Sequence, residues 1–391
     1  MIPPFTLGAP SRIVFGCGKL AELEKTLLSF GSRPLLVLGD TSFKAGKDFE
    51  TLQKILANLG TPVKTLHIAK EPSPETIDAI VTDKQYSTID MVISIGGGST
   101  LDSGKAIAAM LVEGGAVSRF LEGVGTQRPS GKKLPFIAIP TTAGTGSEAT
   151  SNAVLSAVGS KGYKKSLRHD SYFADLALVD PILTLSCPRS LTISCSMDCF
   201  TQLVEGYLSI GGSPLTDAIA LEGIRKISRA LRPVTSDGTN LAARSNLSYA
   251  ALLSGLVLAN AGLGTVHGFA TVIGGLFEIP HGVICGSLMA PSNQSTLKKL
   301  RITAPEHPAL YKYATLGRIF TTQTGHTDSW YQDHFIAELE KLSDDLAFPS
   351  LSDYGIRKGD AEKIAAQTGN KNNPAQLPQE DLVEILRSRI K

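Results

Sequence analysis

The sequence predicts two domains of different class: an α/β domain built on a parallel sheet over residues 1–184, followed by an all-helical domain over residues 185–391. Three observations indicate this division. A chain of 391 residues exceeds what one ordinary core can bury. Short apolar runs alternate with amphipathic stretches in the first half. After Val179-Asp180-Pro181 the strand-like runs fade and long helical patterns dominate.

The first half begins with strands and helices in alternation. Continuous apolar runs at 34–40, 63–68 and 91–95 predict strands, and amphipathic stretches at 49–59 and 75–82 predict the helices between them. Strands without a polar face, separated by helices of this length, are typical of a parallel sheet covered on both sides.

The second half is rich in Ala, Leu, Ile and Ser at helical spacing, and Pro188 suits the first turn of a helix. We predict individual helices at 188–207, 216–231, 241–262 and 380–390.

Composition limits the partners. The 38 basic and 36 acidic residues give a formal net charge of +2, so no strong field favours nucleic acid or an anionic membrane. Five scattered cysteines without a CxxC pair favour a reducing compartment over a disulfide framework. The N-terminus shows no signal-peptide pattern, and no apolar run reaches about 18 residues. We therefore expect a cytoplasmic protein with a small-molecule partner.

Two segments after predicted strands suit phosphate binding. Gly96-Gly97-Gly98-Ser99 opens a helix, where residues without Cβ let a diphosphate approach and free amides donate hydrogen bonds. The segment matches neither the GxGxxG fingerprint nor the P-loop. The second segment, 140–148, follows another strand with a dense run of hydroxyls and glycines that suits ribose, phosphate or amide groups. A polar turn is the alternative interpretation of either segment.

A divalent metal site is indicated in the helical half. Asp198 and Gln202 lie four apart in a run of helical character, so both point from one face. His267 and His281, each beside a glycine, could meet that face. A carboxylate and two imidazoles form a ligand set that leaves a position open for substrate. The alternative is that both histidines are ordinary buried residues.

Four ordered motifs carry a resemblance to a known family. GGGSTLDSGKAIA, IPTTAGTGSEAT, ADLALVDPILT and VHG…IPHG together resemble the iron-containing (group III) alcohol dehydrogenases, and the likeness runs from FTLGAPSRIVFGCGKL to NNPAQLPQEDLVEIL. The resemblance implies a dinucleotide-binding α/β domain and a helical domain of the dehydroquinate synthase-like fold, with the active site in the cleft between them.

The resemblance also assigns cofactor contacts. It places the pyrophosphate at Gly97, Gly98 and Ser99, and Asp102 beside the nicotinamide ribose. Further cofactor contacts are implied for Thr141, Thr142, Ser147 and Lys164. Asp40 matches the position of an acidic residue that accepts the adenosine ribose hydroxyls, which favours NAD over NADP because a carboxylate repels a 2′-phosphate.

The family's metal site, one aspartate and three histidines with a fourth histidine nearby, is only partly matched. Asp198, His267 and His281 match and are the expected catalytic residues. Gln202 stands where the first histidine is expected, and Thr271 stands at the place of the additional one. An amide oxygen is a weaker donor than imidazole for Fe²⁺ or Zn²⁺. We therefore expect a weakly bound metal at Asp198, Gln202, His267 and His281, or a site that has lost it.

The leading hypothesis is an NAD(P)-dependent alcohol dehydrogenase that moves hydride between a primary alcohol and nicotinamide, with the metal as Lewis acid. The alternatives are a lyase or cyclase of the dehydroquinate synthase type with bound NAD, and a nucleotide-binding relative with impaired catalysis. We also expect a homo-oligomer, a dimer. The basic residues Lys164, Lys165, Arg168 and His169 indicate either a site for an acidic substrate group or a solvated loop with one cofactor-binding lysine.

Overall fold

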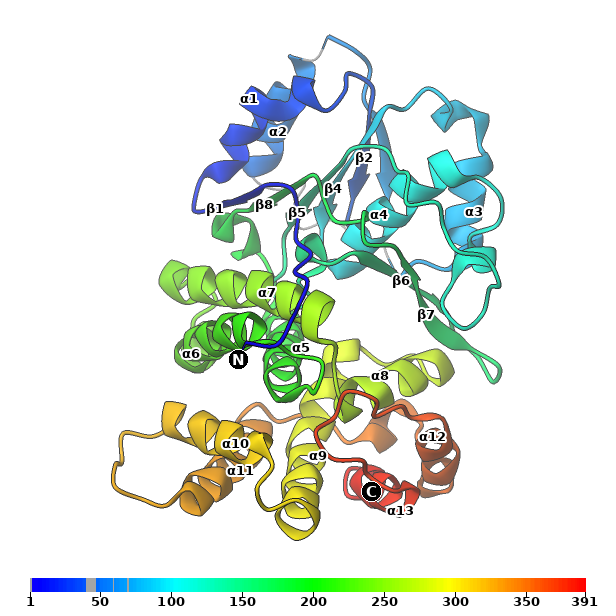
Figure 1. The fold of residues 1–391 in the computed structure, drawn as a ribbon. Coiled ribbons are helices and arrows are strands. Elements are labelled where there is room, and N and C mark those ends of the chain that lie inside the picture. Colours follow the sequence, from blue (N-terminus) through cyan, green and yellow to red (C-terminus); the bar gives the residue numbers. More distant parts are fainter. Residues whose placement is uncertain (1, 40–46, 59, 69) are drawn as a thin grey trace.

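The computed structural model describes the chain except residues 1, 40–46, 59 and 69. A six-stranded sheet occupies one end of the molecule and a set of helices the other (Figure 1). This arrangement confirms the predicted fold class. The strands in spatial order are β1 (Ile13–Phe15), β8 (Leu176–Val179), β5 (Phe136–Pro140), β4 (Met91–Gly96), β2 (Pro34–Leu38) and β3 (Lys64–His67), and every neighbouring pair is parallel.

The four central strands are buried along their whole length, which explains their continuous apolar sequences. Alternate side chains point to opposite faces, so Leu35 and Val37 belong to one core and Leu36 and Leu38 to the other. The first core is covered by α3 (Pro74–Thr82) and α4 (Gly98–Glu113), and the second by α1 (Leu23–Thr26) and α2 (Lys47–Ala57).

The strand order reverses between β2 and β4. From β2 the chain moves outward to β3, then returns past β2 to β4 and continues to β5 on the other side. In open α/β sheets, ligands bind at the carboxyl ends of the strands at such a reversal. Gly39 and Gly96 end these two strands and lie in contact, since a Cβ on Gly39 would be 3.4 Å from the Gly96 Cα. Asp40 lies outside the described residues.

A separate antiparallel hairpin joins β6 (Asn152–Ala157) to β7 (Tyr163–Arg168). The basic residues Lys164, Lys165 and Arg168 therefore lie on a strand, and the interpretation of this segment as a loop was wrong. The hairpin reaches the helical half, where the Gly159 amide donates to the Gly275 carbonyl at 3.1 Å.

The other half contains nine α-helices among the described residues: α5 (Arg189–Leu208), α6 (Pro214–Ser236), α7 (Leu241–Ala261), α8 (Thr265–Leu276), α9 (His281–Thr303), α10 (Pro308–Ile319), α11 (Asp328–Asp345), α12 (Ala361–Gln367) and α13 (Gln379–Arg387). Capping side chains stabilise the N-termini of several of these helices. The Ser213 hydroxyl accepts from the Thr216 amide at 3.2 Å at the start of α6, and the Asn240 side chain accepts from the Ala243 amide at 3.0 Å at the start of α7. The last short turn before α5 is η7 (Pro181–Thr184). The division of the domains at residue 184 stays a prediction.

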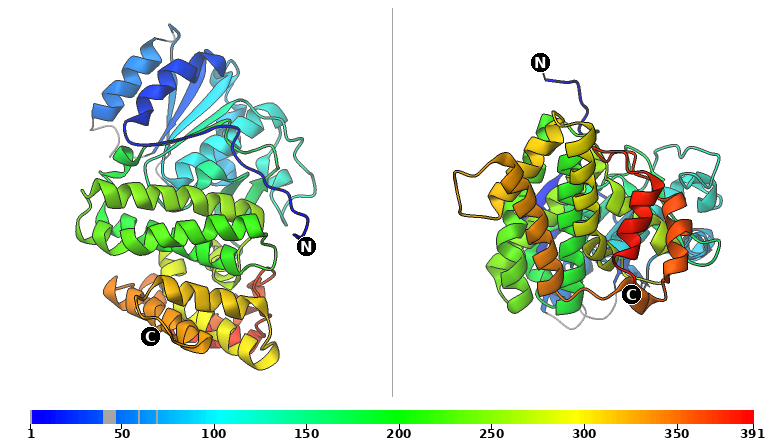
Figure 2. Two further views of the ribbon diagram at one scale, coloured as in Figure 1. Left: turned by 60° about the vertical axis from the view of Figure 1, so that its left-hand side comes forward. Right: turned by 90° about the horizontal axis from the view of Figure 1, so that it is seen from below.

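Helix α7 is long and apolar enough to cross a membrane by length and composition, but 67% of its most apolar window is buried inside the protein. It packs against α5 and α6 as a core helix (Figure 2). The N-terminal segment runs down beside it, and the Asn260 side chain exchanges two hydrogen bonds with the Gly8 backbone, at 2.6 and 2.8 Å. The N-terminal segment that leads into β1 is therefore tied to α7.

Candidate active site and metal centre

A cleft of about 1030 Å³ lies between the two halves of the molecule. The α4 helix, the β6–β7 hairpin and nearby loops line one side, and α5, α7, α8 and α9 line the other. The cleft brings together most of the residues that the sequence singled out: Gly98, Ser99, Asp102, Ser147, Lys164, Asp198, Gln202, His267 and His281. Gly97, Thr141 and Thr142 lie just behind the lining, since the Thr141 amide donates to the Gly96 carbonyl at 2.9 Å and a Cβ on Gly97 would touch Thr142 at 3.4 Å. The predicted role of Asp40 falls on a residue outside those that the structure describes.

The start of α4 forms one wall of the cleft. Gly98 and Ser99 are its first residues, and amides at the start of a helix have no partner within it. A Cβ on Gly98 would lie 2.6 Å from the Thr145 hydroxyl, so this glycine also lets the second predicted loop pack against the first. The two segments therefore form one surface with free backbone donors, as phosphate binding requires.

Asp102 connects the start of α4 to the second loop and to strand β6 through hydrogen bonds. Its carboxylate accepts from the Ser147 hydroxyl and, at 3.1 Å, from the Val154 amide of β6. Burial raises the pKa of Asp102, against the opposing effect of Lys105. The side chain predicted to lie beside the nicotinamide ribose thus also positions the loop and the hairpin.

Two buried ionisable residues beneath the loop, Lys105 and Glu148, were not predicted from the sequence. Lys105 is completely buried and donates to the Ser147 and Asn152 carbonyls and the Thr150 hydroxyl, each at 2.8 Å. Burial lowers the pKa of Lys105 to about 8 and raises the pKa of Glu148 to about 7.

The opposite wall carries a cluster of metal-type donors. Asp198 on α5, His267 on α8, and His281 and Cys285 on α9 each place one donor atom within 4.8 Å of the others. The Asp198 Oδ1 lies 3.2 Å from the His267 Nε2 and 3.6 Å from the His281 Nε2. The three residues expected from the sequence therefore meet, and Cys285 joins them.

Glu205, one helical turn beyond Gln202 on α5, fixes the orientation of His267. Its carboxylate accepts from the Val266 amide at 2.6 Å and lies 2.7 Å from the His267 Nδ1. A hydrogen bond at Nδ1 leaves Nε2 free to face Asp198, which is how proteins set the tautomer of a metal-binding histidine. Spacing along α5 was a signal for Glu205, because it follows Asp198 on the same helical face.

The electrostatics of the cluster suit a cation. Burial lowers the pKa of His267, but Cys285, Asp198 and Glu205 outweigh burial and raise this pKa well above its usual value. Burial and the Lys164 ammonium lower the pKa of His281 to about 4. Two buried carboxylates thus surround His267, and a divalent cation can take the place of its proton. The donor set of carboxylate, imidazoles and thiol fits Fe²⁺ or Zn²⁺.

Gln202 and Thr271, the two departures from the family pattern, both line the cleft. The Gln202 Nε2 donates to the Asp198 Oδ1 at 3.2 Å, and its Oε1 is buried without a partner among the described residues. The Thr271 hydroxyl donates to the His267 carbonyl at 2.9 Å. Metal binding by Gln202 stays a prediction.

Lys164 projects from β7 into the cleft and forms an ion pair with Glu71. Its side chain is only 11% exposed, and its charge acts on both His281 and Asp198 across the cleft. This position explains its effect on His281.

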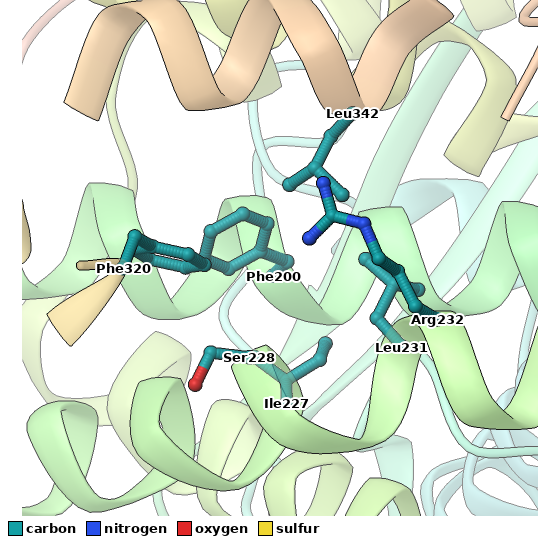
Figure 3. A pocket seen from close by; sticks show the side chains of 7 residues that line it. All are labelled: Phe200, Ile227, Ser228, Leu231, Arg232, Phe320 and Leu342. Carbon is teal, nitrogen blue, oxygen red and sulfur yellow. The ribbon is translucent and has the colours of Figure 1, made fainter. Parts of the chain in front are cut away.

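A second hollow lies inside the helical half and is lined mainly by apolar side chains and by Arg232 (Figure 3). Its volume is about 10 Å³. A single water needs roughly 10–15 Å³ of such space, so this hollow is too small for a substrate.

Comparison with known proteins identifies the family. Residues 10–181 match the model of "Iron-containing alcohol dehydrogenase", and residues 192–390 match "Fe-containing alcohol dehydrogenase family, C-terminal". The chain belongs to the iron-containing alcohol dehydrogenase family and is an oxidoreductase of the alcohol dehydrogenase class.

Individual relatives agree with this assignment. The chain is 36% identical over 301 residues to long-chain-alcohol dehydrogenase 1 of Geobacillus thermodenitrificans, covering 74% of this chain and 75% of that protein. It is 27% identical over 387 residues to the NAD-dependent methanol dehydrogenase of Bacillus methanolicus, covering 97% and 98%. A crystal structure of 1,3-propanediol oxidoreductase superposes with a TM-score of 0.87 at 27% identity, covering 99% of this chain and all of that one (100%). These likenesses favour the dehydrogenase over the lyase or cyclase alternative.

Proposed function

We propose that this protein catalyses reversible hydride transfer between a primary alcohol and NAD, assisted by a divalent metal held by Asp198, His267 and His281. The observation that carries the proposal is the single cleft, because the free amides of α4 and the donor cluster of α5, α8 and α9 line it together. A cofactor held at the first wall would meet a substrate held at the second.

Each wall has its own task. Gly98 and Ser99 bind the pyrophosphate through their amides, and Lys164 adds a positive charge between the phosphate wall and the cluster. When bound, NAD accepts the hydride and the metal polarises the alcohol oxygen. Asp198 and the two imidazoles supply the donors, and Glu205 holds His267 in the required orientation.

The Thr271 hydroxyl is engaged with the backbone of its own helix, so it does not replace the proton-relaying histidine expected there. The cofactor ribose and solvent in the cleft remain as the route for the alcohol proton.

We further propose NAD as the cofactor, a cytoplasmic location and a homodimer. The choice of NAD over NADP is supported by Asp40 and by the likeness to the NAD-dependent methanol dehydrogenase of Bacillus methanolicus. A cytoplasmic location is supported by the five free cysteines, one of them exposed. A homodimer is proposed from the resemblance alone.

The test follows NADH absorbance across a panel of primary alcohols, and NADH consumption with the matching aldehydes. Asp198→Asn keeps the shape of the side chain but removes the charge at the centre of the cluster. We expect kcat/KM to fall at least about 100-fold, which is about 2.7 kcal/mol of transition-state stabilisation. Asp345→Ala, an exposed carboxylate on α11, is the control and should leave the rate unchanged. No NADH formation with any alcohol, in protein that binds both NAD and metal, would contradict the proposal.

A further inference from the structure

The donor cluster contains a residue that neither the motif pattern nor the family resemblance assigned to it. Cys285 is completely buried on α9, and its Sγ lies 3.7 Å from the Asp198 Oδ1 and 3.8 Å from the His267 Nε2. It follows His281 by four residues, so both side chains point from one face of the helix.

The packing of α9 on α5 brings this face to Asp198. Gly282 makes the approach possible, since a Cβ there would lie 1.9 Å from the Ser194 carbonyl oxygen. The thiol is therefore held against the carboxylate by backbone contact between two helices rather than by a mobile loop.

The distances fit a four-coordinate metal. In a tetrahedral zinc site, nitrogen and oxygen donors lie roughly 3.3 Å apart and a sulfur lies roughly 3.5 Å from either, by the usual metal–ligand distances. The observed separations from the Asp198 Oδ1 are 3.2 Å to His267, 3.6 Å to His281 and 3.7 Å to Cys285. The Cys285 Sγ also lies 3.8 Å from the His267 Nε2, so four of the six edges are within a few tenths of an ångström of these values. The two remaining edges, from His281 to His267 and to Cys285, lie within 4.8 Å, so completing the tetrahedron requires His281 to move towards both.

The Gln202 side chain does not present its oxygen to the cluster. Its amide nitrogen, not its oxygen, faces the Asp198 Oδ1 at 3.2 Å, and the oxygen has no partner among the described residues. In this orientation Gln202 supports the carboxylate as a hydrogen-bond donor and leaves the fourth ligand position to another side chain.

We propose that Cys285 is the fourth protein ligand, as a thiolate, in an Asp-His-His-Cys site, and that this ligand shifts the metal preference towards Zn²⁺. Thiolate is a soft donor that suits zinc, whereas a carboxylate and imidazoles alone also suit Fe²⁺. Zinc can expand from four to five neighbours during a reaction, so four protein donors do not exclude a substrate oxygen. The inference rests on the metal site of the proposed function.

The test is X-ray absorption at the zinc edge of the full-length protein loaded with zinc and quantified by elemental analysis. We expect one sulfur neighbour at about 2.3 Å beside lighter donors at about 2.0–2.1 Å. Cys285→Ser and Cys285→Ala should both lose the sulfur and bind zinc at least tenfold more weakly. Cys187→Ser, a buried cysteine elsewhere in the helical half, is the matched control and should keep the sulfur.

A shell of only nitrogen and oxygen in the zinc-loaded wild type would overturn the inference, as would a failure to bind zinc. Cobalt gives an independent readout, because a thiolate ligand adds a near-ultraviolet charge-transfer band that the Cys285 variants should lack. The alcohol assay separates this inference from the proposed function. A zinc–sulfur shell without NADH formation supports Cys285 as a ligand and contradicts the proposed function. NADH formation with a sulfur-free shell supports the proposed function and contradicts Cys285 as a ligand.

Discussion

Asp198 is the residue on which the geometry of the site depends, because four neighbours gather round one of its oxygens. Two histidines, the Cys285 thiol and the Gln202 amide all lie within 3.7 Å of the Asp198 Oδ1. Burial opposes ionisation, yet His281 and His267 hold the pKa of Asp198 below its usual value. The carboxylate is therefore charged and oriented before any metal arrives.

Gln202→His should strengthen metal binding, because an imidazole adds a donor for iron or zinc at a position where the amide presents its nitrogen to Asp198. The new ring would stand one helical turn after Asp198, on the same face. We expect higher metal content in the purified protein by elemental analysis. In the Cys285→Ser background the same change should restore at least part of the lost zinc affinity. Unchanged content in both backgrounds would show that this position does not reach the metal.

Asp40→Gly should narrow the preference for NAD over NADP, since it removes both the ribose acceptor and the charge that repels a 2′-phosphate. The measurement is the ratio of kcat/KM for the two cofactors. A wild type that prefers NADP, or a ratio unaffected by the substitution, would show that Asp40 is not the selector.

The sequence identified three residues of the donor cluster but not the residues that support them. Asp198, His267 and His281 were recognisable from residue type, neighbouring glycines and motif order. Glu205 also lies on the face of Asp198, but one acidic residue on a helix is usually solvated, so its spacing alone carried little weight. Cys285 could be placed only once α9 was known to begin at His281, because helix boundaries are the least certain part of a sequence-based prediction.

The loop between β5 and β6 is the element that links the two halves. Gly144 and Gly146 allow its contact with the helices, since a Cβ on Gly144 would lie 2.7 Å from the Cys195 Cβ and one on Gly146 would lie 2.5 Å from the Ala251 carbonyl oxygen. Gly146 also has a φ of +62°, which other residues rarely adopt. The loop is therefore held in place by α5 and α7 on one side and by Lys105 on the other.

Glu148→Gln should stabilise the protein more at pH 8 than at pH 5. Burial raises the pKa of Glu148 from 4.5 to about 7, so the folded state favours the neutral carboxyl and loses stability as pH rises from about 4.5 through 7. An amide mimics the neutral form at every pH. The stability gain should therefore widen by up to about 3 kcal/mol, at about 1.36 kcal/mol per pKa unit.

Guanidinium unfolding of both proteins at the two pH values measures this difference, because titrating groups distant from Glu148 contribute equally to each; Lys105, whose pKa is raised by the Glu148 charge, differs between them. A gap that stays constant or narrows towards pH 8 would show that Glu148 is not neutral in the folded protein.

The strands β2 and β4 and the helices α5, α6 and α7 were predicted because continuous burial gives a clear apolar or helical pattern, whereas α9, which is as long as α6, was not predicted. The β6–β7 hairpin was not predicted either. Its second strand, Tyr163–Arg168, is half-exposed and carries Lys164, Lys165 and Arg168, so it shows no apolar alternation. Its strand structure comes from pairing with β6 and from contact with the end of α8, both of which are tertiary interactions.

At the scale of the whole molecule, each half supplies a different set of donors to the cleft. The sheet presents backbone donors at the reversal of its strand order, and the helices present charged and imidazole donors from three separate segments. Among the residues that the structure describes, neither half holds both sets, so the proposed function depends on the cleft that the two halves line together.

Removal and return of the metal test this account most directly. Protein stripped by a chelator should still bind NAD by calorimetry, since the α4 amides remain, but should form no NADH from a primary alcohol. Zinc or ferrous iron, added back to one equivalent at the Asp198 cluster, should restore turnover in proportion to occupancy. NADH formation at an undiminished rate in metal-free protein would contradict the account.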